Sequence, residues 1–217
     1  MSATRSDLPR LLTWLSPAFP IGAFAYSHGL EWAVEAGDVR DEGTLTDWLD
    51  ALLHHGSGWA DAVLLRHAYR ADTQQELAAV AELAVAVQPG RERRAETVGQ
   101  GTAFTLAAEI WGTPRLEGAV PYPIAFGALA RAQAIPEDLA VTGFLHAFMA
   151  SLVSAAVRLI PLGQMAGLRV IAALEPAVLA VAEASRAAGL DAIGGACFRA
   201  DIAALRHETQ YTRLFRT

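Results

Sequence analysis

The chain of 217 residues carries 17 basic and 23 acidic side chains, which gives a formal net charge of −6, and every basic residue is an arginine. This acidic balance argues against nucleic acid as a partner, and without lysine the chain lacks the phosphate-binding lysine of P-loop NTPases and any Schiff-base nucleophile. Cys197 is the single cysteine and cannot form an internal disulfide, which fits a reducing, cytoplasmic environment.

The apolar content is high for a soluble chain, at 53% with a mean hydropathy of +0.28. The stretch 139–157 is long enough to cross a bilayer at about 1.5 Å per residue. It contains polar residues, has no aromatic belt and is flanked by acidic residues at one end. We therefore interpret it as the central helix of a soluble domain, and expect neither a membrane partner nor a signal peptide.

The apolar spacing predicts helices almost throughout and no strand, so the expected fold class is all-α. The first helix is expected to end before Pro17, because proline disfavours the helical conformation in the residue that precedes it. After a loop rich in proline and glycine, a second helix is expected from about Ala25 to Gly37, a residue suited to a left-handed C-cap. Thr44 with Asp47 is interpreted as a capping box that opens the next helix.

Later elements follow from the same signals. Thr73 with Glu76 forms a fuller capping box. Pro136 is expected to open the central apolar helix over about 137–158, and Pro176 to separate two short helices. Helices are also expected over 59–69, 91–111, 124–132, 163–174, 177–188 and 198–207. The prediction is one domain over 1–217, with nine to ten helices and a C-terminal tail at about 207–217.

No signature of a common enzyme class occurs: there is no G-x-S-x-G, H-E-x-x-H, C-x-x-C or glycine-rich nucleotide motif. His54 and His55 are adjacent, so on a helix they point about 100° apart and cannot easily share an ion. We expect His146 to be a hydrogen-bonded core residue, His207 a solvated helix end and Cys197 a small core residue. Because a tight metal site needs three or more converging ligands, none is expected.

Two segments carry more information than a core or a loop requires. Residues 16–31 read S-P-A-F-P-I-G-A-F-A-Y-S-H-G-L-E, which places aromatic rings, prolines and glycines around a helix start. Residues 206–216 read R-H-E-T-Q-Y-T-R-L-F-R and alternate arginine with Tyr211, Leu214 and Phe215, residue types enriched in interfaces. The tail either packs on its own domain or binds a partner, and we favour the partner.

Both segments resemble the UreF family of urease accessory proteins. The match is to S-P-x-[LF]-P-[IV]-G-x-[FY]-x-[YH]-S-x-G-L-E over 16–31 and R-L-x-P-L-G-Q over 158–164. Residues 206–217 match R-H-E-x-Q-x-x-R-L-F-x-S except at the last position, where Thr217 replaces serine. Residues 122–127 are similar to the family's H-P-[IV]-A-[FY]-G, with Tyr122 in place of histidine, a departure that argues against a metal role there. Four matches in the same order extend over essentially the whole chain.

The resemblance implies an all-α, cytoplasmic protein that forms a homodimer and joins UreD (UreH in some bacteria) and the GTPase UreG in an assembly that delivers nickel to apo-urease. It implies an adaptor without enzymatic activity or a tightly bound cofactor, nickel being handled by the complex. An arginine that acts on the GTPase's nucleotide is a further hypothesis. The alternatives are a direct nickel-binding metallochaperone, a helical metalloenzyme and an unrelated helical scaffold.

The resemblance and the residue types together give a set of candidate positions. Cys197 and His207 are the candidates for transient nickel contact. The tail is expected to become ordered when UreD binds, and its deletion to leave the fold intact. The candidate partner-binding residues are Pro20, Gly22, Phe24, Tyr26, Ser27, Gly29, Glu31, Arg158, Gln164, Arg206, His207, Glu208, Gln210, Tyr211, Arg213, Leu214 and Phe215.

Overall fold

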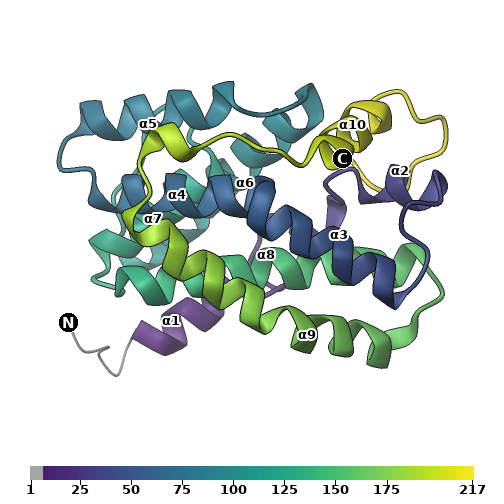
Figure 1. Ribbon diagram of the computed structural model, residues 1–217. Coiled ribbons are helices and arrows are strands. Elements are labelled where there is room, and N and C mark those ends of the chain that lie inside the picture. The colour runs from purple at the N-terminus through teal and green to yellow at the C-terminus, as the bar shows by residue number, and fades with distance from the viewer. Residues whose placement is uncertain (1–6) are drawn as a thin grey trace.

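The computed structural model describes residues 7–217 (Figure 1), so the first six residues of the predicted domain lie outside the described range. Over that range the chain forms helices and no strand, which confirms the predicted all-α class. The α-helices are α1 (Asp7–Trp14), α2 (Leu30–Glu35), α3 (Glu42–His55), α4 (Ser57–Arg70), α5 (Gln74–Ala86), α6 (Arg91–Ala108), α7 (Tyr122–Ala132), α8 (Glu137–Leu159), α9 (Gly163–Ala184) and α10 (Phe198–His207). Short 3-10 turns are η1 (Ala23–Ala25), η2 (Glu109–Trp111), η3 (Ser185–Ala187) and η4 (Leu190–Ala192).

Helix α8 runs through the middle of the molecule and contacts α9, α4, α2, α3 and α7 (Figure 1). Its bounds confirm the predicted central helix. Its buried side chains join those of the other helices in one apolar core. A group of aromatic rings fills the centre of that core, where Trp14 meets Phe104 edge-on at 5.2 Å and Phe126 at 6.2 Å between ring centroids.

Two helices within residues 7–217, α8 and α9, are long and apolar enough to cross a membrane by length and composition alone. Half of the most apolar window of α8 is buried inside the fold, and 39% of the corresponding window of α9. A core helix meets the same criterion, because packing on several sides selects apolar residues around its circumference. The burial of α8 is consistent with its predicted role as a core helix.

The predicted start of the second helix is wrong. Helix α2 begins at Leu30, five residues later than expected, because His28 and Gly29 both adopt left-handed backbone conformations, with φ of 56° and 76°. A chain cannot continue a right-handed helix through such residues. The predicted end is close: Gly37 has φ of 79°, as a left-handed C-cap requires.

The capping box of α3 is one turn earlier than predicted. Asp41 is the N-cap, and its carboxylate accepts a hydrogen bond from the backbone N–H of Thr44 at 2.8 Å. The Thr44 hydroxyl reaches back to the Asp41 backbone, so Thr44 closes the box instead of opening it. The box of Thr73 and Glu76 at the start of α5 is confirmed.

Pro176 does not separate two helices, as was predicted. It lies inside the single helix α9, although proline removes one backbone hydrogen bond from a helix interior. Buried side chains continue on one face on both sides of it, namely Val170, Leu174, Val178 and Val181. We attribute the continuity of the helix to this packing, which offsets the lost bond.

His146 was predicted to be a hydrogen-bonded core residue, and this is wrong. It is exposed on α8, where it lines a groove of about 850 Å³ between α1, α8 and α9. The remaining lining is largely apolar and includes the exposed side chains of Leu8, Leu12 and Leu179. One side of the central helix is therefore open to the surface.

Candidate partner-binding site at the docked tail

Three of the four motif segments meet at one end of the molecule. The loop before α2, the end of α8 and the tail lie together, and Figure 1 shows the C-terminal end of the chain beside α2 and α10. The expectation of a tail that orders only on binding is not what the structure has: the tail packs onto its own domain. The reason is a set of buried carboxylate oxygens that accept hydrogen bonds from the backbone and side chains of the tail.

Glu31 is the central acceptor. Its side chain lies in the first turn of α2 and the residue is only 7% exposed. One carboxylate oxygen accepts the backbone N–H of Leu214 at 2.6 Å, and the other accepts that of Phe215 at 2.9 Å and contacts His207 Nε2 at 3.2 Å. Because a buried carboxylate is costly without partners, these contacts stabilise both the charge and the position of the tail.

His207 connects this acceptor to α6. The predicted solvated helix end is wrong, because the His207 ring is fully buried between two carboxylates. Its Nδ1 lies 2.7 Å from Glu92 Oε2, and the other oxygen of Glu92 pairs with Arg213 Nη1, also at 2.7 Å. The imidazole therefore links the C-terminal end of α10 to both α2 and α6.

The end of the tail is fixed by Ser27. The backbone N–H of Ser27 donates to the Thr217 carbonyl at 3.0 Å, and the Ser27 hydroxyl donates to the same oxygen. The Thr217 hydroxyl donates to Glu96 Oε2 at 2.8 Å, and the Arg216 N–H donates to the Ala25 carbonyl at 2.8 Å. The tail thus pairs with the loop that carries the first motif.

Arg158 joins the third motif to the other two. Its guanidinium lies over the Phe215 ring, 4.4 Å from the centroid, and its Nη2 donates to the Phe24 carbonyl at 2.8 Å. Phe215 itself is buried, at 4% exposure. Gln164, from the same motif, is exposed on the first turn of α9 and takes no part in these contacts.

Gly29 allows α10 to approach α2 closely. A Cβ at this position would lie 2.5 Å from the backbone nitrogen of Ala204 and 2.8 Å from the carbonyl carbon of Ala203. The left-handed backbone at Gly29 adds a second reason for glycine. Gly22 is also left-handed, but nothing lies near its missing side chain, so its role is limited to the turn.

Two further tail residues complete the docking. Glu208 accepts the backbone N–H groups of Arg91 at 2.6 Å and Glu92 at 3.3 Å, so it caps the N-terminus of α6 from a distant part of the sequence. Gln210 Nε2 donates to Glu35 Oε2 at 2.6 Å. The inner side of the tail is therefore hydrogen-bonded to the rest of the domain along most of its length.

The outward side presents apolar groups to solvent. Phe198, Ile202 and Leu205 are exposed at helical spacing on α10. Tyr211 is fully exposed and lines one shallow groove with Ile202 and Trp32. We call Phe198, Ile202, Leu205 and Tyr211 the α10 face. Also exposed are the predicted residues Pro20, Phe24, Arg206, Arg213 and Leu214.

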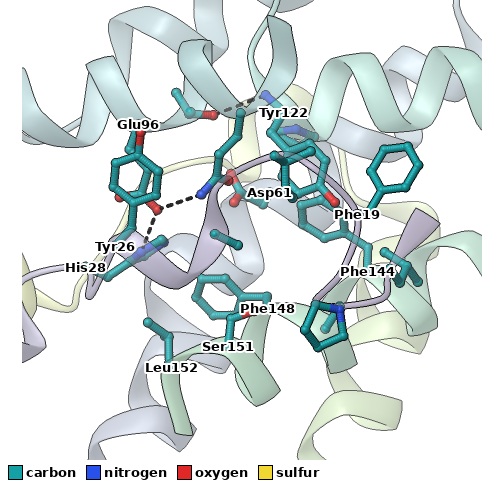
Figure 2. A pocket seen from close by; sticks show the side chains of 18 of the residues that line it. Phe19, Tyr26, His28, Asp61, Glu96, Tyr122, Phe144, Phe148, Ser151 and Leu152 are labelled. Carbon is teal, nitrogen blue, oxygen red and sulfur yellow. Dashed lines mark hydrogen bonds and ion pairs between the residues drawn. The ribbon is translucent and has the colours of Figure 1, made fainter. Parts of the chain in front are cut away.

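A largely buried polar cluster of His28, Asp61, Arg93 and Glu96 lies beside the end of the tail, where Glu96 accepts the Thr217 hydroxyl; Figure 2 labels His28, Asp61 and Glu96. Glu96 forms an ion pair with Arg93, and its Oε1 lies 3.0 Å from His28 Nδ1. Burial alone would raise the pKa of Glu96, but Arg93 and His28 together lower it to about 2. Burial lowers the pKa of His28, aided by Arg93, and raises that of Asp61 to about 7.

The cluster borders two small cavities. The first, of about 70 Å³, is lined by the cluster and by Tyr26, Tyr122 and several phenylalanine rings (Figure 2). The second, of about 100 Å³, is lined by His28, Asp61, Arg93 and residues of α10. Tyr122, which stands where the family has histidine, is half-buried there, and desolvation raises the pKa of its hydroxyl. Tyr26 is the only predicted partner-binding residue that lines the first cavity.

No group of three or more His, Cys, Asp or Glu side chains in residues 7–217 is arranged to hold a metal ion. Cys197 is half-buried at the start of α10, and burial raises the pKa of its thiol. Its predicted core position is thus only partly correct.

The sequence did not point to Glu92, Arg93, Glu96 or Asp61 as site residues. Glu92 and Glu96 are four residues apart, which places both on one face of α6. This spacing was the one feature of the sequence that could have indicated Glu92 and Glu96 as site residues. Acidic residues at such spacing are common on solvated helix faces, so the signal is weak without knowledge of what packs above them.

Comparison with known proteins gives consistent matches over the whole chain. A family model described as UreF matches residues 39–175, a range that lies between the first motif and the tail. A protein named urease accessory protein UreF from Rhodopseudomonas palustris (strain BisA53) is 52% identical and covers 100% of this chain and 95% of its own length. Proteins of the same name from strain TIE-1 and from Bradyrhizobium sp. (strain ORS 278) are each 53% identical, covering 96% and 99% of this chain and 91% and 94% of their own lengths.

Proposed function

The chain belongs to the UreF family of urease accessory proteins, and from this premise we propose that it is a cytoplasmic, non-enzymatic adaptor in urease maturation. In this proposal it binds UreD, called UreH in some bacteria, and the GTPase UreG, and assists nickel insertion into apo-urease. The observation that carries the proposal is the α10 face. It is apolar and exposed, and the opposite side of α10 is held in place by the buried residues Ala203 and His207, the latter between Glu31 and Glu92.

The α10 face is the surface that we assign to UreD. Aromatic and aliphatic side chains on a fixed support are typical of the centre of a protein interface. Because Glu31 and Ser27 already hold the tail, binding costs less conformational entropy than it would for a free segment. In this proposal the docking surface exists before UreD binds, whereas the sequence had suggested a tail that becomes ordered on binding.

Co-expression with a tagged UreD tests this assignment. Ile202→Asp introduces a charge at the centre of the α10 face and is expected to reduce co-purified UreD at least tenfold, because burying an unpaired charge costs more than the roughly 1.4 kcal/mol that a tenfold loss requires. The matched control is Leu106→Asp on α6, since Leu106 and Ile202 are 50% and 51% exposed. Equal recovery of UreD with both variants would contradict the assignment.

UreG is the second partner in the proposal. A regulatory role predicts that the rate of GTP hydrolysis by UreG changes when the chain and UreD are added. If one of the exposed arginines acts on the nucleotide, its replacement by alanine is expected to remove the rate change without removing UreG from the complex. Sizing of the co-expressed proteins separates binding from catalysis.

The groove between α1, α8 and α9 is the surface that we assign to a second copy of the chain. Among the described residues, Glu175 is, apart from His146, the single acidic or basic side chain in a largely apolar lining, so a two-fold contact of this surface with itself buries mostly apolar groups. Leu179→Asp in the groove is expected to give a monomer by light scattering. Leu168→Asp, on α9 but outside the lining of the groove, is the control, with 57% exposure against 60% for Leu179.

Direct nickel binding is the alternative function. It rests on the half-buried thiol of Cys197 at the start of α10, since a thiolate is a good ligand for soft divalent metals. Stoichiometric nickel that stays with the isolated chain through gel filtration, and is lost in Cys197→Ser, would support it. Nickel that leaves the isolated chain but stays with the assembly would support the adaptor.

A further inference from the structure

Asp61 is a buried carboxylate without a partner. The residue is 8% exposed, and within residues 7–217 its side chain accepts no hydrogen bond and forms no ion pair. It lines both the cavity of about 70 Å³ and the cavity of about 100 Å³, and Figure 2 shows it among the side chains that surround the first. A buried carboxylate in this state is costly until a cation or a hydrogen-bond donor reaches it.

A second carboxylate lines the larger cavity. Asp201, on α10, is partly buried, and its side chain likewise has no hydrogen bond or ion pair in the described part of the chain. The one arginine in this lining is Arg93, which is already paired with Glu96. Burial raises the pKa of both aspartic acids, and Arg93 offsets only part of the shift. The lining therefore offers two carboxylates to a cation from outside.

The lining favours an extended cation over a metal ion. No group of three or more His, Cys, Asp or Glu side chains in residues 7–217 is arranged to hold a metal ion. A guanidinium is planar and has five N–H donors, so it can reach carboxylates that do not converge on one point. An arginine also has an apolar stem that packs against apolar walls. The walls of this cavity include Leu52, Val87, Pro89 and Ile193.

The larger cavity opens beside the α10 face. Its lining includes the exposed residues Val87, after α5, and Gly195, before α10. At about 100° per residue, Asp201 lies about 40° from Leu205 around the axis of α10, and the buried Ala204 lies on its other side. Asp201 is therefore at the edge where the α10 face meets the cavity, within reach of a side chain from a protein bound to that face.

We propose that this cavity receives the guanidinium of an arginine from the protein that binds the α10 face, with Asp61 and Asp201 holding its charge. The inference rests on the assignment of the α10 face to UreD and adds the residue type that anchors the complex. The net charge of −6 favours the approach of a cationic group. Arginines that fill pockets at an interface are typical hot spots, and breaking a buried charge pair speeds dissociation.

Recovery of tagged UreD from co-expression tests the proposal. Asp61→Asn and Asp201→Asn keep the size of each side chain and remove its charge, so each is expected to reduce recovered UreD at least tenfold. Asp191→Asn is the control, because Asp191 is exposed near the cavity in sequence but is not part of its lining. The urea midpoint of Asp61→Asn shows whether this buried substitution folds, and Asp201→Asn at the partly exposed site is the second variant.

Replacing the arginines of UreD by glutamine, one at a time, identifies the occupant. One replacement is expected to lower recovery with the wild-type chain at least tenfold, yet to cause little further loss with Asp201→Asn, because the pair is already broken. N-acetylarginine amide added to the isolated chain tests the other source of a guanidinium. Saturable shifts of the Asp201 amide resonance with this probe, and no such arginine in UreD, would overturn the proposal in favour of a free guanidinium compound.

The failure of this site and the failure of the UreD assignment give different results. Unchanged recovery with Asp61→Asn and Asp201→Asn, while Ile202→Asp reduces it, would refute the arginine site and leave the α10 face assigned to UreD. Unchanged recovery with all three variants would refute both.

Discussion

The guanidinium of Arg158, at the end of the central helix, lies over the ring of Phe215, fifty-seven positions later in the sequence, at 4.4 Å from the ring centroid. Arg158→Met keeps an apolar cover on the ring but removes the charge and the hydrogen bond to Phe24. We expect a loss of about 1–2 kcal/mol in the free energy of unfolding, measured by urea denaturation. The free energy of unfolding of Arg158→Lys is expected to lie between those of the wild type and Arg158→Met, since lysine retains the charge but lacks the planar guanidinium.

Glu31→Gln tests the main acceptor of the tail. A glutamine has one acceptor oxygen and places an NH₂ group against the backbone N–H of Leu214 or Phe215. We expect a loss of about 2 kcal/mol in stability together with faster exchange of the tail amides. Glu35→Gln, which affects only the exposed contact with Gln210, is the control and is expected to change stability by less than about 0.5 kcal/mol.

Gly29→Ala tests the close approach of α10 to α2. The new methyl group would lie within 2.8 Å of the backbone of Ala203 and Ala204, so the helices have to separate. Gly37→Ala is a matched control, because Gly37 has a nearly identical φ but nothing within 4 Å of the added atom. We expect about 1 kcal/mol of backbone strain in both variants and a further loss of at least 2 kcal/mol in Gly29→Ala alone. Equal destabilisation would show that strain, not contact, requires glycine at position 29.

Local signals in the sequence predicted much of the fold. Thr73 and Glu76 are three residues apart, so their capping box is visible as a pattern. Local signals gave the wrong result at Pro176, where the packing of buried residues on both sides outweighs the tendency of proline to end a helix. It also failed at Asp41, because two overlapping caps were possible and the sequence does not rank them.

The contacts of the site were harder to predict for a physical reason. Glu31 and Leu214 are separated by 183 positions, and no spacing rule connects residues that far apart. The motifs identified both segments as unusual, but not that they bind each other. His207 illustrates the consequence: at the end of a helix it was expected to be solvated, and only the arrival of Glu31 and Glu92 from two other helices makes it a buried residue.

The stability of the fold at acid pH is expected to depend on Glu96. Its pKa is about 2 in the folded chain, against an ordinary value of 4.5. A carboxyl whose pKa is lowered on folding contributes stability above its unfolded pKa and loses it as pH falls through the folded pKa. Glu96 therefore contributes about 3 kcal/mol above pH 4.5, lost progressively towards about pH 2. In Glu96→Gln the fall in the urea midpoint between these pH values is expected to be smaller than in the wild type. The same fall in both proteins would mean that Arg93 and His28 do not hold the Glu96 charge in the folded state.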